Sequence, residues 1–327
     1  MIFQLLEQAR SFNASDLHLS AGSVPKVRIN GVLSSLGEQA LSAADIESLA
    51  ASILKSDDFA MLYKNGQVDC GIGQSFEKRF RVNVFRQQGS IAMAVRIIQS
   101  RPPSCAELGL PQSVIGFTEL KQGLVLIGGP TGSGKSTTLA ALINKINQEQ
   151  LLHIITLEDP IEYIYSGGKS LVNQREVGRD TNSFASGLRA ALREDPDVIM
   201  VGELRDAETM ATALTAAETG HLVLATIHIN DAVNCVNRIL DMLPERQIKA
   251  QLADCLQGIV CQRLVVRSDG QGRIGAFEVL VATDALRSLI RDGKTCQIGS
   301  YLQTGAKYGM VTLSAYIEQL RKKGLIK

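Results

Sequence analysis

A stretch of eleven residues constrains the fold of this chain more than any other feature: "GGPTGSGKSTT", from residue 128 to residue 138. Positions 129–136 match the pattern G-x-x-x-x-G-K-[ST], whose glycines allow successive backbone N–H groups to face bound phosphates. The apolar run "GLVLIGG" leads into this stretch, and "KSTTLAALINKINQ" continues it with the period of a helix. A strand, a glycine-rich turn and a helix in this order predict a phosphate-binding loop.

The residue types in this loop predict how it holds a nucleoside triphosphate. We expect Lys135 to reach the β- and γ-phosphates, and Ser136 to offer its hydroxyl to Mg²⁺. The amino end of the following helix adds positive potential at the same place. The predicted nucleotide-binding residues of the loop are Gly129, Pro130, Thr131, Gly132, Ser133, Gly134, Lys135, Ser136 and Thr137.

The segments after the loop alternate between buried strands and helices. "LLHIITLED", "DVIMVGE" and "HLVLATIH" are apolar runs of strand length, and "FASGLRAALRED" has a helical pattern. This alternation predicts an α/β fold, in which a largely parallel sheet is covered by helices on both faces.

The residues before the loop have a different rhythm. Short alternating runs around Asn30–Gly31 and around Gly89 predict pairs of strands, and Ser42 is the expected N-cap of a helix. These features indicate a small α+β domain. Three prolines in residues 99–111 suit a connecting segment. The predicted division is a first domain at 1–98, a linker at 99–112 and a second domain at 113–327 with a helical carboxyl-terminal part.

Composition argues against several classes of protein. The chain has 34 Lys and Arg against 33 Asp and Glu, and this balance does not suit binding of nucleic acid by bulk electrostatics. Its apolar runs are far shorter than the roughly 20 residues of a bilayer span, so we expect no transmembrane segment. The six cysteines form no C-x-x-C pair, which fits reduced thiols in a cytoplasmic protein better than a zinc ribbon.

Hydrolysis requires acidic side chains at the ends of strands beside the phosphate loop. Gly202 stands where many such enzymes carry an aspartate, and Glu203 follows it. The segment "TLEDPIEY" supplies Glu158, Asp159 and Glu162 at the end of another strand. We interpret Glu158 and Glu203 as Mg²⁺-site residues that act through water. A solvated acidic turn is the alternative for the carboxylates of "TLEDPIEY".

Two histidines, His221 and His228, flank the strand "LVLATI". Seven residues apart on a strand with a rise of roughly 3.3 Å per residue, they are not expected to share a metal ion. His228 follows the end of the strand that faces the phosphates, so we expect it to sense the γ-phosphate. For His221, a role at the nucleotide and a structural hydrogen bond stay equally open.

Together these segments resemble the hexameric ATPases of type IV pili and type II secretion. The resemblance rests on "GPTGSGKSTTLA", "LEDPIEY", "LRAALREDPDVIMVGELRDAET" and "ALTAAETGHLVLATIH". In addition, "SDLHLSAGSVPKVRINGVL" is similar to the PAS-like domain of that family. The resemblance implies a PAS-like domain followed by a RecA-like P-loop ATPase domain, ATP and Mg²⁺ as cofactors, and a homohexameric ring.

Within that family the chain resembles the retraction ATPases, the PilT-like branch. It has no tetracysteine insertion, which extension and secretion ATPases usually carry, and "ALRSLIRDGKTCQIGSYLQTGAKYGMVTLS" is similar to a retraction segment. "HINDAVNCVNRIL" departs from the family pattern. The resemblance implies a motor for pilus retraction and twitching motility at the cytoplasmic face of the inner membrane. Its implied partners are the inner-membrane pilus platform protein and the pilus machinery.

The resemblance also implies roles for single residues. Glu162 corresponds to the general base, Glu203 to the Walker B glutamate near Mg²⁺, and the two histidines to the family's His box. Arg81 and Arg96 correspond to arginines of the first domain that reach the phosphates. An arginine on a mobile domain neutralises transition-state charge only when the domains close. Solvated charge is the alternative for both arginines. The implied catalytic residues are Lys135, Glu162, Glu203, His228, Arg81 and Arg96.

A helix is predicted over "ALRSLIRDGK", at residues 285–294, with apolar residues at the i, i+3, i+4 spacing of one face. Arg287, Arg291 and Lys294 lie on its other side. Similarity to the retraction branch favours an element that transmits motion to the pilus machinery. A surface helix that packs on its own domain is the alternative.

Three other functions stay open: an accessory or divergent paralogue, a secretion or DNA-uptake ATPase, and a weakly hydrolysing regulatory ring. The balanced charge gives the DNA pump little support. The presence of Lys135, Glu162 and Glu203 argues against a ring that hydrolyses weakly, because loss of carboxylates is its expected mark.

Overall fold

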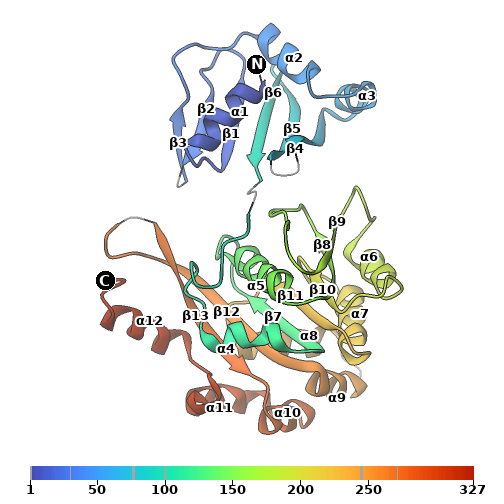
Figure 1. Ribbon diagram of the computed structural model, residues 1–327, viewed down its shortest axis with the longest axis vertical. Coiled ribbons are helices and arrows are strands. Elements are labelled where there is room, and N and C mark those ends of the chain that lie inside the picture. Colours follow the sequence, from blue (N-terminus) through green and yellow to red (C-terminus); the bar gives the residue numbers. More distant parts are fainter. Residues whose placement is uncertain (1, 30, 76–77, 99–100, 244–245, 271) are drawn as a thin grey trace. The chain divides into compact units, whose positions relative to one another are not determined.

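The structure is a computed structural model that describes residues 2–29, 31–75, 78–98, 101–243, 246–270 and 272–327. Its contacts divide the chain into two compact units, Met1–Arg101 and Pro102–Lys327. Figure 1 labels the elements of both.

The first unit is a six-stranded antiparallel sheet of order β3-β2-β1-β6-β5-β4. Its helices share one hydrophobic cluster with the sheet, in which Leu6, Ile46 and Leu62 are buried against strand residues such as Val82 and Val95. The elements are α1 (Ile2–Ser11), β1 (Asp16–Ser20), β2 (Lys26–Ile29), β3 (Val32–Ser35), α2 (Ala43–Ala51), α3 (Ser56–Asn65), β4 (Gln67–Ser75), β5 (Lys78–Gln87) and β6 (Ser90–Ile97).

Local sequence signals in this unit have the expected structural effect. Ser42 caps α2, because its Oγ accepts a hydrogen bond from the Asp45 backbone N–H at 3.2 Å and the Asp45 carboxylate accepts one from the Ser42 backbone N–H at 2.8 Å. Gly89 has φ +75° between β5 and β6, where a left-handed residue lets the strands reverse. Asn30, the first residue of the other predicted turn, lies outside the described residues.

The second unit contains a seven-stranded sheet of order β13-β12-β7-β11-β10-β8-β9. Its neighbouring strands pair in parallel, except for β12 with β13. The predicted α/β fold with a largely parallel sheet is confirmed. The strands are β7 (Gly123–Gly128), β8 (His153–Glu158), β9 (Leu171–Glu176), β10 (Val198–Val201), β11 (Leu222–Ile227), β12 (Leu256–Val266) and β13 (Arg273–Val281).

Helices cover both faces of this sheet, as the alternation of side chains along β7 illustrates. Leu124 and Leu126 belong to the core with α6 to α11, whereas Val125 and Ile127 belong to the core with α5. The helical segments are α4 (Gln112–Ile115), η1 (Gly116–Glu119), α5 (Lys135–Glu149), α6 (Phe184–Ala191), α7 (Ala207–Glu218), α8 (Ala232–Met242), α9 (Arg246–Cys255), α10 (Asp284–Arg291), η2 (Thr295–Gln297), α11 (Ile298–Thr304), η3 (Ala306–Tyr308) and α12 (Leu313–Lys322).

Most of the predicted linker lies within the second unit, which begins at Pro102. Cys105 and Leu110 are buried in the core beside α5, and the Cys105 thiol donates a hydrogen bond to the Ala141 carbonyl oxygen at 3.6 Å. The prolines that suggested a linker exclude regular helix and strand, but they do not prevent apolar neighbours from being buried. The boundary that the contacts define, between Arg101 and Pro102, lies within the predicted linker of 99–112.

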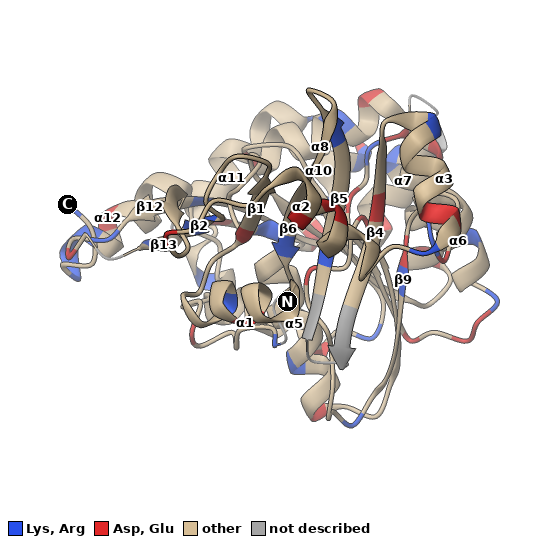
Figure 2. Ribbon diagram, turned by 90° about the horizontal axis from the view of Figure 1, so that it is seen from above, with Lys and Arg blue, Asp and Glu red and all other residues tan. Residues whose placement is uncertain are grey.

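In the part of the chain that the structure describes, no helix is both long and apolar enough to cross a bilayer. Basic and acidic residues are interspersed along the ribbon in Figure 2, in keeping with the formal net charge of +1.

Candidate active site

Parallel pairing brings four strand ends to one edge of the second unit's sheet. β7, β8, β10 and β11 run side by side in the same direction, so the residues that follow their carboxyl ends are neighbours. The phosphate-binding loop follows β7, the acidic segment follows β8, Glu203 follows β10 and His228 follows β11. In open α/β sheets ligands bind at this edge. The fold therefore gathers most of the predicted site residues in one place.

The backbone of the phosphate-binding loop requires glycine at its start. Gly129 has φ +143°, and a Cβ built there would lie 2.5 Å from the Gln262 carbonyl oxygen and 2.6 Å from Ser133 Oγ. Gln262, on β12, contacts the loop directly, because its amide Nε2 donates to the Ser133 carbonyl oxygen at 2.6 Å. The loop is thus held against a second strand of the sheet.

Lys135 places a cation inside the loop. Its side chain is 7 % exposed, and Nζ donates to the carbonyl oxygens of Gly129 at 2.9 Å and Pro130 at 3.1 Å. Burial lowers the pKa of Lys135, while the nearby carboxylates of Glu203 and Glu162 act in the opposite direction. A buried ammonium, a glycine-bent backbone and the amino end of α5 fit a polyphosphate. Ser136 is exposed on the first turn of α5, as a ligand of Mg²⁺ has to be.

His228 and Glu203 lie beside Lys135, after the carboxyl ends of β11 and β10. The His228 ring has Nδ1 3.5 Å from Lys135 Nζ and Nε2 3.2 Å from Glu203 Oε1. Because a lysine ammonium only donates, this geometry favours the tautomer in which Nδ1 accepts and Nε2–H donates to Glu203. His228 therefore lies between the loop lysine and the glutamate, in contact with both.

Gly202 explains why the acid after β10 is shifted by one position. A Cβ at Gly202 would lie 3.1 Å from the Leu157 carbonyl oxygen on β8, closer than side chains normally approach. An aspartate at this position would require the Leu157 carbonyl to shift by a few tenths of an ångström, and the carboxylate comes instead from Glu203.

Glu158 does not take the position expected of a Mg²⁺-site residue. Its side chain is 6 % exposed and accepts hydrogen bonds from Thr156 Oγ1 at 2.7 Å, from Gln174 Nε2 at 3.0 Å and from the Glu162 backbone N–H at 3.4 Å. Burial raises its pKa to about 7. A carboxylate whose oxygens are already used by protein donors holds a loop in place better than it holds a hydrated cation. The alternative of a solvated turn does not fit Glu158 either.

The structure does not bring His221 to the phosphate-binding loop. His221 precedes β11, so it lies at the opposite end of that strand from His228. Its Nδ1 lies 3.0 Å from the Ala216 carbonyl oxygen and 3.3 Å from Thr219 Oγ1, both at the end of α7. Within this chain, the geometry of His221 therefore fits a structural hydrogen bond and does not fit nucleotide binding.

Arg81 and Arg96 belong to the first unit, where they occupy directly opposite positions on β5 and β6. Arg81 Nε lies 3.5 Å from Asp69 and Arg96 Nε lies 3.4 Å from Asp16. Opposite positions on paired strands share one face of a sheet. The two arginines thus form one basic pair with an acidic residue on either side.

Arg205 and Gln262 are site residues that sequence analysis missed. Arg205 Nε donates to Glu203 Oε2 at 2.7 Å, and its Nη1 lies 3.9 Å from Asp159 Oδ2. Arg205 therefore ties the acid after β10 to the acidic segment after β8. Its position two residues after Glu203 was the available signal. Gln262 has no such signal, because its contact with the loop depends on the pairing of β12 with β7.

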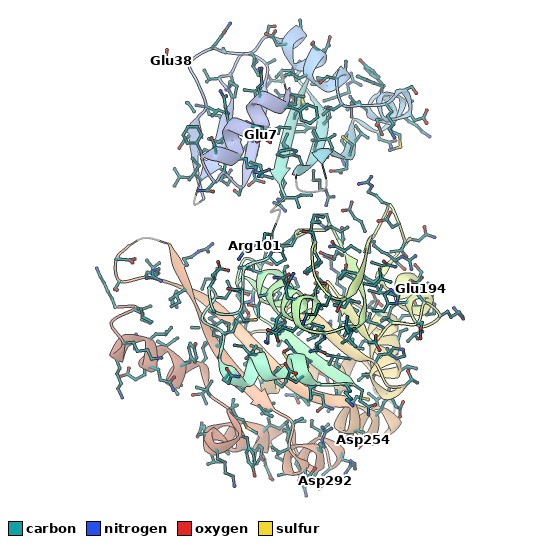
Figure 3. The ribbon with its side chains drawn as sticks, viewed as in Figure 1. Glu7, Glu38, Arg101, Glu194, Asp254 and Asp292 are labelled. Carbon is teal, nitrogen blue, oxygen red and sulfur yellow. The ribbon has the colours of Figure 1, made fainter. Side chains whose placement is uncertain are left out.

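The helix α10 packs on its own domain. Leu286 and Ile290 are fully buried and Leu289 is partly buried against the same core, which is the alternative that its apolar spacing left open. Two of the basic residues predicted on the other side of this helix also contact α9. Arg287 donates to the carbonyl oxygens of Ala253 and Asp254, and Arg291 pairs with the Asp254 carboxylate at 2.7 Å. Figure 3 labels Asp254 on α9 and Asp292, which follows α10.

The chain is similar to proteins of one family over most of its length. The family model "Type II/IV secretion system protein" matches residues 1–310. The chain is 44% identical over 303 residues to the uncharacterized protein YggR of Escherichia coli, covering 92% of each. It is 41% identical over 328 residues to the type IV pilus retraction ATPase PilT of Pseudomonas aeruginosa, covering 99% of this chain and 95% of that one. A crystal structure of the pilus retraction motor PilT with bound ADP matches with a TM-score of 0.92 and 47% identity, covering 100% of this chain and 94% of that one.

Proposed function

The chain belongs to the type II/IV secretion system protein family, and from this premise we propose that it is an ATP-driven motor that retracts type IV pili. One observation carries the proposal: Lys135, Glu203 and His228 meet at one sheet edge, in a chain that is similar to PilT over 99% of its length. ATP with Mg²⁺ supplies the bond whose hydrolysis drives the motor.

Each residue of the site has a distinct task in the proposed reaction. Lys135 and the amino end of α5 hold the phosphates and balance their charge. Ser136 and Glu203 would hold Mg²⁺, Glu203 through water. Glu162 takes the proton of the attacking water. The Glu162 carboxylate acts to raise the pKa of Lys135, which is the direction expected of a carboxylate that faces the phosphate site.

We infer that His228 reports the state of the phosphates to Glu203, with which it shares a 3.2 Å contact. Arg81 and Arg96 would supply charge from the first unit, so that hydrolysis depends on domain closure. This dependence couples chemistry to motion.

The proposed assembly is a homohexamer at the cytoplasmic face of the inner membrane, where the pilus platform protein and the pilus machinery are its partners. The retraction relative and the retraction-type segment around α10 support this placement. A head-to-tail ring suits a motor whose identical subunits pass a signal to one another, because such an interface is heterologous and closed.

Hydrolysis by purified protein tests the enzymatic part. We expect Mg²⁺-dependent ATP hydrolysis by the wild type, and normal ATP binding without turnover by Glu162→Gln, since an amide cannot take a proton from water. Wild-type turnover in Glu162→Gln together with loss of turnover in Glu203→Gln would reverse the two roles. Absence of Mg²⁺-ATP hydrolysis by the wild-type hexamer would overturn the proposal.

A further inference from the structure

The loop between β8 and β9 carries Glu162, and side chains of these two strands hold its backbone. The Ile161 N–H donates to Glu176 Oε2 at 3.1 Å, and the Glu162 N–H donates to Glu158 Oε2 at 3.4 Å. A base that must lie within hydrogen-bond reach of a water needs a fixed backbone, because displacement by about 1 Å can cost on the order of 100-fold in rate. What fixes this loop therefore bears on turnover.

Gln174, on the edge strand β9, makes three of the contacts that fix the loop. Its Nε2 donates to Glu158 Oε1 at 3.0 Å and to the Tyr163 carbonyl oxygen at 2.8 Å. Its Oε1 accepts from the Tyr165 N–H at 3.2 Å. One amide thus satisfies a buried carboxylate, a carbonyl and an N–H at once. A carboxylate in its place could not, because it has no donor when ionised.

Tyr163 extends this contact across the site. Its hydroxyl donates to Thr137 Oγ1 at 3.2 Å, and Thr137 follows Ser136 on the first turn of α5. The residue next to the proposed base is therefore bound to β9 through its carbonyl and to the phosphate-binding helix through its side chain. The hydrogen bonds that link Gln174 to Tyr163 and Tyr163 to Thr137 thus connect the edge strand of the sheet to the phosphate-binding loop.

We propose that Gln174 is a positioning residue for hydrolysis, which together with Tyr163 fixes Glu162 relative to the phosphate-binding loop. This inference rests on the proposed role of Glu162 as the base. Gln174 acts on the geometry of the loop and touches neither nucleotide nor water itself. It should therefore affect the rate of turnover and leave ATP affinity unchanged.

The neighbouring residues of β9 provide a matched control. Asn173 is exposed, and the Arg175 side chain pairs with Glu194, labelled in Figure 3, at 2.7 Å. Side chains alternate between the faces of a strand, so Asn173 does not share the face of Gln174. Asn173→Ala changes the same strand and leaves the three hydrogen bonds of Gln174 in place, so we expect wild-type kinetics from it.

The experiment compares kcat, KM and ATP-analogue affinity in full-length Gln174→Ala, Gln174→Glu and Asn173→Ala. We expect kcat of Gln174→Ala to fall about 10- to 100-fold, with KM and affinity within about twofold of wild type. Gln174→Glu should lose more at neutral pH, because its carboxylate faces that of Glu158. Its activity relative to wild type at the same pH should recover as the pH is lowered and one carboxyl becomes protonated, and the melting temperature at each pH shows whether stability changes in parallel.

Three results would overturn the inference: kcat of Gln174→Ala within twofold of wild type, a parallel loss of ATP affinity, or an equal loss in Asn173→Ala. If Gln174→Ala folds poorly, the variant Tyr163→Phe tests the inference in its place, since it removes a single hydroxyl. An unchanged kcat in Tyr163→Phe counts against the inference, and a several-fold loss of kcat supports it. Wild-type turnover in Glu162→Gln would instead overturn the role of the base, so the two failures are distinguishable.

Discussion

At the scale of the residue, the site depends on buried groups that keep charge next to a place for phosphate. Lys135 is buried at 7 % exposure, which disfavours its charged form, yet two carboxylates and two loop carbonyls surround it. Such a cation is costly to leave without anionic partners, and phosphate oxygens are the partners that match it.

Replacing Lys135 should therefore weaken nucleotide binding. We expect Lys135→Ala to raise the Kd of ATP about 10- to 100-fold, the range for loss of hydrogen bonds to a charged group. Fluorescent-nucleotide titration measures this. Lys145, later on α5 and paired with Glu149, is the control. Equal effects of Lys135→Ala and Lys145→Ala would show that general charge, and not the loop, binds the nucleotide.

Glu158 makes stability depend on pH. Its pKa rises from 4.5 to about 7 on burial, so the folded chain binds a proton that the unfolded chain has lost within this window. The free energy of unfolding should thus fall as pH rises from about 4.5 to about 7, by about 3 kcal/mol, and the loss is complete above that window. Urea unfolding of wild type and Glu158→Gln across this range isolates the effect. A difference between the two proteins that stays constant with pH would refute it.

At the scale of the element, strands and helices followed from local patterns, whereas contacts between elements did not. The loop glycines, the Ser42 cap and the apolar strands are visible in short windows, and each produced the expected element. The burial of Glu158 depends on β9, which the sequence does not mark as its neighbour. The packing of Cys105 against α5, within the predicted linker, likewise leaves no local signal.

Two substitutions on α10 can separate a role in transmitting motion to the pilus machinery from a role in the stability of the fold. Ile290 is fully buried, so Ile290→Ala should cost about 2–5 kcal/mol and lose function through unfolding. Ser288 is exposed on the same helix. Ser288→Glu should leave purified ATPase activity largely intact while cells lose surface twitching and accumulate pili. Normal twitching with normal protein levels would mean that this face of α10 does not contact the pilus machinery.

At the scale of the whole molecule, the proposed function depends on two units and on several copies of the chain. Arg81 and Arg96 were identified through resemblance alone, because two arginines in strands carry no local sign of a nucleotide. The structure shows them as a pair on one sheet face, each beside an aspartate. We expect Arg81→Ala and Arg96→Ala to reduce turnover more than thermal stability, as measured by ATPase assay and melting temperature. A loss of stability equal to the loss of turnover would assign them to folding.

Assembly is testable directly. Light scattering with Mg²⁺-ATP should give the mass of a hexamer at concentrations where hydrolysis is maximal, since each site is expected to act within a ring. Full activity in a sample that contains only monomer or dimer would refute the ring.

Retraction of labelled pili in living cells tests the central claim most directly. Cells of the source organism that lack this chain are complemented with wild type or with Glu162→Gln, and single pili are followed by fluorescence microscopy. We predict that pili extend and retract with the wild type, and that they extend but stay extended without the chain or with Glu162→Gln. Retraction at wild-type frequency and speed in cells that lack the chain would contradict the account.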